Sequence, residues 1–382
     1  MIPRLAEPTL HRLARGFRAV VILGPRQSGK TTLARAAFPD KPYVSLEAPH
    51  ERIFAATDPR GFLARFPDGA ILDEIQHLPQ LFSYLQVDMD ADRRRGRFVL
   101  TGSQNFSMVS SIAQSLAGRA AIVQLLPLSI RELGSGRIPG GNLDELLFKG
   151  SFPALYDQPV TPQDWYASYV TTYLERDVRQ LANVHDLLQF QRFLGLCAAR
   201  TGQLLNIASL ASDCGIAQGT VRSWLGVLQA SYVVSLLPPH HENLGKRLIK
   251  SPKLHFLDTG LAAFLIGVQD ARHLSVHSAR PALFETFVAA EFVKQRFNAG
   301  LRSNLFFWRD NIGTEIDILV EDGSGLFPIE IKSGGTLNEE FFDGLRRYLK
   351  YAGPRAAGAG LVYGGDESYV RSGFSVRSWR DL

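Results

Sequence analysis

The chain has 382 residues, 45% of them apolar and 21% charged, with a formal net charge of +5 and two cysteines. This is the composition of an ordinary globular protein, so general disorder is excluded, and the length allows two or three cores. Cys197 and Cys214 form no metal-type pair and exclude a disulfide framework. No apolar run approaches the ~18 residues of a membrane helix, and the first residues lack the apolar segment of a secretory signal. We therefore expect a cytoplasmic protein whose mild basic excess permits nucleic-acid contact without requiring it.

The first 130 residues alternate apolar runs typical of strands with helical stretches, which predicts an α/β fold. Most of these runs are continuously apolar, as expected of strands that are buried on both faces of a parallel sheet. The expected strands are residues 19–23, 43–46, 70–72, 98–100 and 121–125.

A phosphate-binding loop is expected directly after the first strand. Residues 24–31 match G-x-x-x-x-G-K-[ST] in full between a strand and a helix, where glycines let backbone N–H groups surround phosphates. A chance glycine-rich turn is the alternative. Lys30 would reach the β- and γ-phosphates of ATP, and the Thr31 hydroxyl would ligate Mg²⁺. The expected nucleotide-binding residues are Gly24, Pro25, Arg26, Gln27, Ser28, Gly29, Lys30, Thr31 and Thr32.

Two carboxylates follow the third strand, at the sheet edge where ligands of parallel sheets bind. We expect Asp73 to hold Mg²⁺ through water and Glu74 to polarise the attacking water as the catalytic base, with His77 as the next candidate. An Asp-Glu pair at a strand end is usually only a solvated terminus. Its position after a phosphate loop favours the catalytic interpretation.

Two further catalytic candidates lie beyond the fourth strand. Ser103, in a polar segment that continues to Asn105, would place a hydroxyl near the γ-phosphate or the attacking water. The alternative is a loop that caps the next helix. Arg119 is a candidate γ-phosphate sensor or arginine finger, with a structural salt bridge as its alternative.

Residues 18–132 resemble a P-loop ATPase of the AAA+ superfamily, in the branch often called archaeal-type. The resemblance rests on the phosphate loop, on the strand ends at 72–76 and 100–103, and on the segments 115–119 and 126–129. The whole chain resembles bacterial and archaeal proteins in which this ATPase precedes a C-terminal domain of unknown function, of which segments 173–178 and 250–261 are typical. The resemblance implies an ATPase whose biological role is poorly defined.

The middle of the chain is predicted to be mostly helical and contains a helix–turn–helix pattern. A short helix at 207–213, ended by Gly215, precedes a second helix at 218–229 with one apolar face. The following strand-like run and polar loop resemble the wing of a winged-helix module, which would either contact DNA or pack against another domain. The best basic patch for DNA is expected to consist of Lys246, Arg247, Lys250 and Lys253.

The C-terminal part matches the PD-(D/E)XK nuclease pattern, with Glu285 on a helix, Asp317 on a strand, and Glu330 and Lys332 on the returning strand. The strand period of two places Glu330 and Lys332 on one side, and Glu315 on the side of Asp317. In such sites Asp317 and Glu330 would hold Mg²⁺, and Lys332 would support the attacking water. The alternatives are a solvated Glu-x-Lys strand and a binding scaffold that cleaves nothing.

The expected fold class is therefore α/β, with a P-loop NTPase parallel sheet, then a helical winged-helix module, then an α/β PD-(D/E)XK nuclease-like domain. The expected boundaries are 1–133 for the ATPase, 134–164 for a linker, 165–275 for the middle module and 276–382 for the last domain. We expect ATP hydrolysis with Mg²⁺ to drive or gate a nucleic-acid-associated C-terminal region. The alternative is an ATP-gated regulator that binds a protein partner without cleaving nucleic acid. A homo-oligomer is left open.

Overall fold

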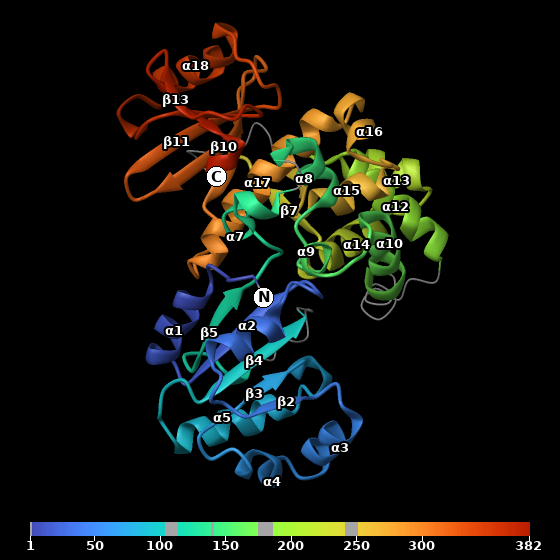
Figure 1. Ribbon diagram of the computed structural model, residues 1–382, viewed down its shortest axis with the longest axis vertical. Coiled ribbons are helices and arrows are strands. Elements are labelled where there is room, and N and C mark those ends of the chain that lie inside the picture. Colours follow the sequence, from blue (N-terminus) through green and yellow to red (C-terminus); the bar gives the residue numbers. More distant parts are fainter. Residues whose placement is uncertain (1, 104–113, 139–140, 175–185, 241–250) are drawn as a thin grey trace. The chain divides into compact units, whose positions relative to one another are not determined.

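The computed structural model describes residues 2–103, 114–138, 141–174, 186–240 and 251–382, and it divides into two compact units (Figure 1). Unit 1 comprises Met1–Leu128, Ala230–Tyr232 and Lys294–Arg302. Unit 2 comprises Ser129–Gln229, Val233–Val293 and Ser303–Leu382. No described helix is long and apolar enough to cross a membrane. Both cysteines are buried and free.

Unit 1 contains a five-stranded sheet in the order β2-β3-β4-β1-β5, and all of its ladders are parallel. The strands are β1 (Ala19–Gly24), β2 (Tyr43–Ser45), β3 (Ile71–Asp73), β4 (Phe98–Ser103) and β5 (Ala120–Gln124). Every residue of β1 and β4 is buried, as the continuous apolar runs predict. The parallel α/β sheet predicted from the sequence is thus confirmed.

The helices of unit 1 lie alongside this sheet (Figure 1). Leu10 of one helix and Leu33 of another pack in one core with Val20 and Ile22 of β1 and Val123 of β5. This packing holds the start of α2 against the end of β1, where the phosphate loop lies. The helices are α1 (Glu7–Gly16), α2 (Lys30–Ala37), α3 (Pro49–Thr57), α4 (Pro59–Ala64) and α5 (Leu81–Ala91), with a 3₁₀ turn η1 (Ile75–His77).

The middle of the chain is mainly helical, as predicted. Its helices are α7 (Ile130–Leu133), α8 (Leu143–Lys149), α9 (Ala154–Asp157), α10 (Pro162–Tyr169), α12 (Leu187–Ala199), α13 (Ile207–Cys214), α14 (Gln218–Ala230), α15 (Thr259–Leu265) and α16 (Ala271–Val276). Gly215 ends α13 with a φ of 69°, in the left-handed region that favours glycine. The helix pair α13–α14 therefore lies where the helix–turn–helix pattern places it.

A small antiparallel sheet accompanies this helix pair, in the order β6-β8-β7. Its strands are β6 (Gln203–Leu204), β7 (Val234–Leu237) and β8 (Lys253–Phe256). Residues 241–250, which contain most of the predicted wing, lie outside the described residues. The winged-helix identity stays a prediction.

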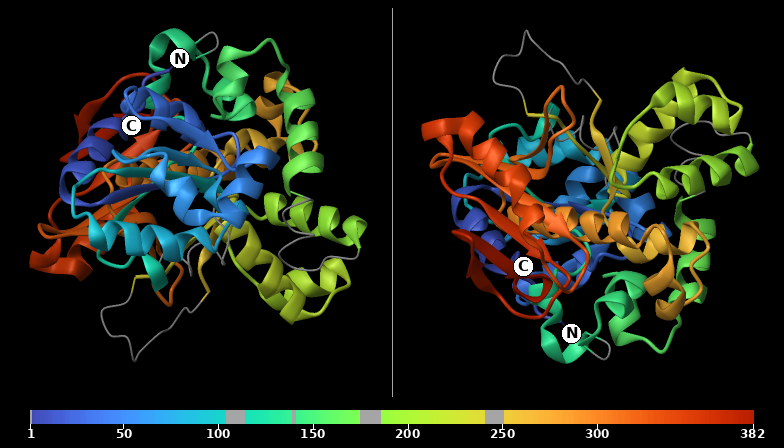
Figure 2. Two further views of the ribbon diagram at one scale, coloured as in Figure 1. Left: turned by 90° about the horizontal axis from the view of Figure 1, so that it is seen from below. Right: turned by 90° about the horizontal axis from the view of Figure 1, so that it is seen from above.

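The C-terminal part consists of α17 (Arg280–Asn298) and a six-stranded mixed sheet in the order β13-β14-β12-β11-β10-β9. Leu345 and Tyr348 of α18 pack on Ile316, Leu319 and Leu361 of this sheet. Figure 2 gives two further views of the sheet, in red and orange. Its elements are β9 (Leu305–Arg309), β10 (Glu315–Asp322), β11 (Gly325–Lys332), β12 (Gly360–Tyr363), β13 (Tyr369–Arg371), β14 (Phe374–Ser378) and α18 (Asp343–Ala352). The predicted antiparallel hairpin is the pair β10–β11.

Candidate nucleotide site and a C-terminal acidic cluster

The loop between β1 and α2 has the backbone that a phosphate-binding loop needs. A Cβ atom on Gly24 would lie 2.1 Å from the carbonyl oxygen of Leu125, so only glycine fits there. Gly29 has a φ of 90°, and Gln27 also has a positive φ, of 61°. No described side chain caps the amino end of α2, so the N–H groups of its first turn remain available to an anion.

Lys30 points back into the loop. Its side chain is buried, and its Nζ donates to the carbonyl oxygens of Gly24, at 3.2 Å, and Pro25, at 2.8 Å. These two carbonyl oxygens hold the ammonium beside the loop that is expected to surround the phosphates.

Asp73, at the end of β3, accepts hydrogen bonds from three hydroxyl groups. Thr31 Oγ1 lies 2.9 Å from Oδ1 and 3.0 Å from Oδ2, and the Tyr43 hydroxyl lies 2.8 Å from Oδ2. The Thr101 hydroxyl also donates to Oδ1. The structure therefore brings together the two residues that were predicted to hold Mg²⁺, Thr31 and Asp73.

Tyr43 and Thr101 are partners of Asp73 that the sequence patterns did not indicate. Leu100 of β4 pairs with Leu72 of β3, so Thr101 and Asp73, the next residues on the two strands, are neighbours. Burial and the hydrogen bond to Asp73 raise the pKa of Tyr43 to about 12, so its hydroxyl stays protonated and donates. Neither residue can be recognised as a partner of Asp73 unless the order of the strands in the sheet is known.

Glu74 adopts a left-handed backbone conformation with a φ of 54°, which a non-glycine residue seldom adopts. Its Oε2 lies 3.4 Å from Ser103 Oγ and also accepts a hydrogen bond from the Gln76 side chain. Ser103 and Glu74 therefore meet, as their predicted roles require. Burial lowers the pKa of His77, so this side chain is neutral at pH 7.

Arg119 lies away from the loop. It directly precedes β5, and β5 runs parallel to β1 with Ala120 opposite Ala19 and Gln124 opposite Leu23. Because the phosphate loop follows the other end of β1, Arg119 lies at the opposite edge of the sheet. Its Nη2 and Nε lie 2.7 Å and 2.8 Å from the carboxylate of Asp90. The structure thus gives Arg119 the salt bridge that was the alternative to a sensor role. Asn105 lies outside the described residues.

The residues of the predicted nuclease pattern also come together, in unit 2, and we call Glu285, Glu315, Asp317 and Glu330 the acidic cluster. Asp317 Oδ2 accepts from the backbone N–H of Ile331 at 2.8 Å, and Lys332 Nζ lies 2.6 Å from Glu330 Oε1. The hairpin register thus brings Asp317 next to the strand segment that carries Glu330 and Lys332.

Lys253 of β8 extends into this acidic cluster. Its Nζ lies 2.5 Å from Glu315 Oε1, 2.8 Å from Glu285 Oε1 and 3.8 Å from Asp317 Oδ1. Burial alone would lower the pKa of Lys253, but the three carboxylates raise it. Burial and the charge of Asp317 raise the pKa of Glu285 and of Glu330. Lys253 is therefore a charged and buried residue of the cluster.

The buried position of Lys253 changes two expectations from the sequence, one about the basic patch and one about the nuclease metal. Lys253 is buried and takes no part in an exposed basic patch, whereas Lys246, Arg247 and Lys250 lie outside the described residues, so their contact with DNA stays a prediction. Within the part of the chain that the structure describes, no group of three or more His, Cys, Asp or Glu residues is arranged to hold a metal ion. The acidic cluster does not fit a bound metal while Lys253 lies in it.

Comparison with known families divides the chain into three parts. The model of the AAA domain family matches residues 16–134. Two families described as domains of unknown function, DUF8612 and DUF4143, match residues 140–272 and 280–381.

Two curated relatives match most of the chain. They are the uncharacterized proteins Rv2008c of Mycobacterium tuberculosis and Mb2031c of Mycobacterium bovis. Each is 33% identical over 339 residues, which cover 87% of this chain and 74% of the relative.

Solved structures give weaker likenesses. A Walker-type ATPase of Pyrococcus abyssi has a TM-score of 0.40 at 15% identity, over 69% of this chain and 96% of that chain. AMPPCP-bound DnaA from Aquifex aeolicus has a TM-score of 0.32 at 13% identity, over 59% of this chain and 86% of that chain. Neither score is high enough to support a conclusion about this chain.

Proposed function

The chain belongs to the family of the two mycobacterial proteins and carries an AAA domain, and from this premise we propose that it is a Mg²⁺-dependent ATPase. One observation carries the proposal. The carboxylates of Asp73 and Glu74 lie at the edge of the sheet that carries the phosphate loop. The Thr31 hydroxyl donates a hydrogen bond to Asp73, and the Ser103 hydroxyl donates one to Glu74.

Nucleotide binding would use the loop and Lys30. Within the described residues no side chain caps the first turn of α2, so its backbone N–H groups would be free to bind a phosphate. The ammonium of Lys30 would exchange the carbonyl oxygens of Gly24 and Pro25 for β- and γ-phosphate oxygens, which carry full negative charge.

The residues around Asp73 fit a magnesium ion, because a carboxylate and hydroxyls are the oxygen ligands that Mg²⁺ prefers. Thr31 would ligate the ion directly, and Asp73 would hold it through water. Bound Mg²⁺ supplies positive charge that offsets the charge on the phosphates during transfer. The Tyr43 and Thr101 hydroxyls keep the Asp73 carboxylate in place.

Glu74 would act as the general base. It would accept a proton from a water molecule as the water oxygen forms a bond to the γ-phosphorus. The bond from that phosphorus to the bridging oxygen then breaks, giving ADP and phosphate. Ser103 and Gln76 orient the Glu74 carboxylate for this step.

Paired variants test the proposal in the full chain. Lys30→Ala removes the charge that meets the phosphates, so affinity in a fluorescent-ATP titration should fall strongly. Glu74→Gln keeps the shape but not the basicity, so ATP should still bind while hydrolysis falls by about 10²-fold or more. Unchanged affinity in the first variant would overturn the site assignment. Normal turnover in the second would move the base to another residue, with His77 as the first to test.

For unit 2 we infer a binding role in place of cleavage of nucleic acid. The supporting observation is the Lys253 ammonium, which lies among the carboxylates that would have to hold a catalytic metal. Plasmid nicking with Mg²⁺ or Mn²⁺ should show no activity that depends on Asp317. Nicking by the wild type that disappears in Asp317→Ala would contradict this role and restore the nuclease interpretation.

A further inference from the structure

Lys253 has the surroundings of a bound metal ion. It lies on β8, the central strand of the small sheet, and its side chain is only 3% exposed. Its Nζ contacts a carboxylate oxygen of Glu285 on α17 and one of Glu315 on β10. The ammonium is therefore a cation held at the point where the acidic side chains converge.

The charge balance of the cluster depends on this lysine. Among the described residues, the other cations that form ion pairs with the four carboxylates are Lys332, on Glu330, and Arg309, whose Nη1 lies 3.5 Å from Glu315 Oε2. Without Lys253, Glu285 would keep no strong cationic partner in the described structure. Buried charges without partners are costly, so the empty cluster would attract another cation.

The cluster also contains ligands that the lysine leaves unused. His255 follows Lys253 by two residues on β8 and so faces the same side. Its Nε2 is buried 3.9 Å from Glu285 Oε1 and has no hydrogen-bond partner among the described residues. Glu330 is also buried, and its Oε2 lacks a partner in the same part of the chain. Imidazole nitrogen and carboxylate oxygen together form a donor set for a divalent transition metal such as Mn²⁺.

We propose that Lys253 is a built-in cation that occupies a latent divalent-metal site and keeps metal out of it. A metal ion needs carboxylate oxygens at about 2.0–2.6 Å. Because Lys253 Nζ already lies 2.5 Å from Glu315 and 2.8 Å from Glu285, the ammonium and a metal ion compete for one position. Since β8 pairs with a strand on each side, the lysine cannot leave by the fraying of an edge strand.

Mn²⁺ binding to the full chain without nucleotide tests this directly by titration calorimetry. An Asp73→Asn background removes the carboxylate of the ATP site, so that only unit 2 is measured. In this background the unchanged cluster should bind no Mn²⁺ that depends on Asp317. Lys253→Met should gain one Mn²⁺ site that the background lacks, since like-charge competition is removed. Adding Asp317→Asn should abolish that gain.

Lys332→Met is the matched control. It removes the same charge from the same cluster but leaves Lys253 in position. We expect no new Mn²⁺ site in this variant, which separates the vacated position from a general increase in negative charge. Equal gains in both lysine variants would overturn the proposal.

Thermal unfolding provides a second readout. Mn²⁺ should raise the unfolding midpoint of Lys253→Met but not that of the background or of the variant that also carries Asp317→Asn. Lys253→Gln, which retains N–H donors for Glu285, replaces Lys253→Met if the latter does not fold. Asp317-dependent Mn²⁺ binding by the cluster with Lys253 present would overturn the proposal whatever the variants do. A folded variant that lacks Lys253 and gains no site would overturn it equally.

Discussion

Asp73 and Asp317 both stand on sheet strands among further polar side chains, but their neighbours differ in charge. Asp73 is contacted by the neutral hydroxyls of Thr31, Tyr43 and Thr101. Asp317 belongs to a cluster that contains the Lys253 ammonium. A hydroxyl can join a carboxylate in binding a metal ion, whereas an ammonium competes for the same oxygens. The comparison teaches that a carboxylate motif indicates a metal site only when no ammonium of the chain lies at the point where the carboxylates converge.

The largest expected effect is on stability, from removing Lys253. Lys253→Met leaves the partly buried Glu285 and Glu315 without their main cation, so the free energy of unfolding should fall by about 3 kcal/mol, the lower end for a broken buried pair. Tryptophan fluorescence during denaturant unfolding measures this well, because all four tryptophans lie in unit 2. Lys332→Met, at a site 31% exposed, should cost less. Equal losses of unfolding free energy in the two variants would contradict the expectation that the buried Lys253 contributes more to stability than Lys332.

The next effect is on catalysis at the other carboxylate. Asp73→Asn removes the charge expected to hold Mg²⁺, so ATP hydrolysis should fall by about 10²-fold or more. Fluorescent-ATP binding in the presence of a chelator should change little, since Lys30 and the loop remain. Asp68→Asn, an exposed aspartate of the same unit, serves as the control. Normal turnover in Asp73→Asn would show that the hydroxyl-lined carboxylate is not the metal ligand.

A smaller effect should follow from Tyr43→Phe, which removes one hydrogen bond to Asp73 and keeps the ring that lies beneath Arg35. A hydrogen bond to a charged group contributes about 1.5–3 kcal/mol, so we expect hydrolysis to fall by about tenfold, with a higher Mg²⁺ concentration needed for half-maximal rate. Tyr84→Phe, a partly exposed tyrosine of the same unit, should leave both quantities unchanged. An unaltered Mg²⁺ dependence in Tyr43→Phe would leave this residue a structural role only.

The smallest effect is expected from Arg119→Ala. The salt bridge with Asp90 is solvent-accessible, so its loss should change stability little, and hydrolysis should stay close to that of the wild type. Hydrolysis measured over a range of protein concentrations also tests an arginine finger that acts in a neighbouring copy. A large loss that appears only at high concentration would establish that role.

Local patterns predicted much of this protein. The phosphate loop is a run of adjacent residues between a strand and a helix, so its type can be recognised without knowing what surrounds it. The helix pair at 207–213 and 218–229 appears as α13 and α14 because apolar periodicity and a glycine act over one or two turns. The paired β10 and β11 follow from strand alternation and a short turn in the same way.

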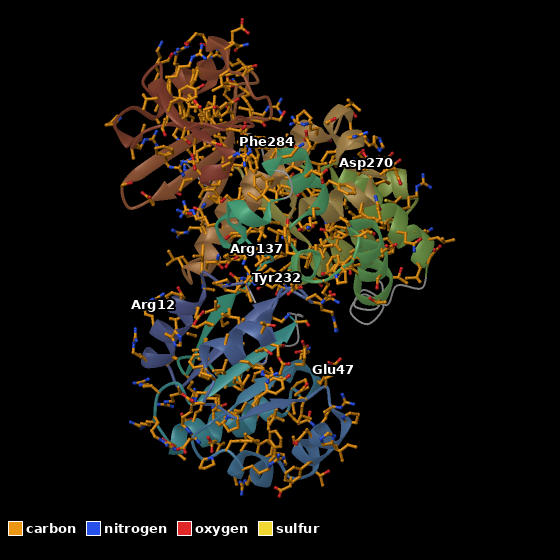
Figure 3. All side chains as sticks on the ribbon, in the orientation of Figure 1. Arg12, Glu47, Arg137, Tyr232, Asp270 and Phe284 are labelled. Atoms are coloured by element: carbon orange, nitrogen blue, oxygen red, sulfur yellow. The ribbon has the colours of Figure 1, made fainter. Side chains whose placement is uncertain are left out.

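Other features depend on packing between distant segments. Tyr43 belongs to β2, which lies beside β3 in the sheet (Figure 1), and this strand order makes it a partner of Asp73. Phe284, labelled in Figure 3, is fully buried and anchors the helix that carries the neighbouring Glu285. The periodicity of apolar residues along the sequence does not reveal these contacts, because hydrophobic burial brings together residues that are far apart in the chain.

The sequence by itself determined the parallel sheet, the phosphate loop and the identity of the acidic residues, since each follows from short-range pattern and side-chain chemistry. The tertiary structure decided which partners those residues meet. It moved Arg119 to the opposite edge of the sheet and placed Lys253, expected on an exposed basic patch, inside the acidic cluster. The physical reason is that a charged group's role depends on burial and on the nearest opposite charge, and both are set by packing between elements that the sequence separates.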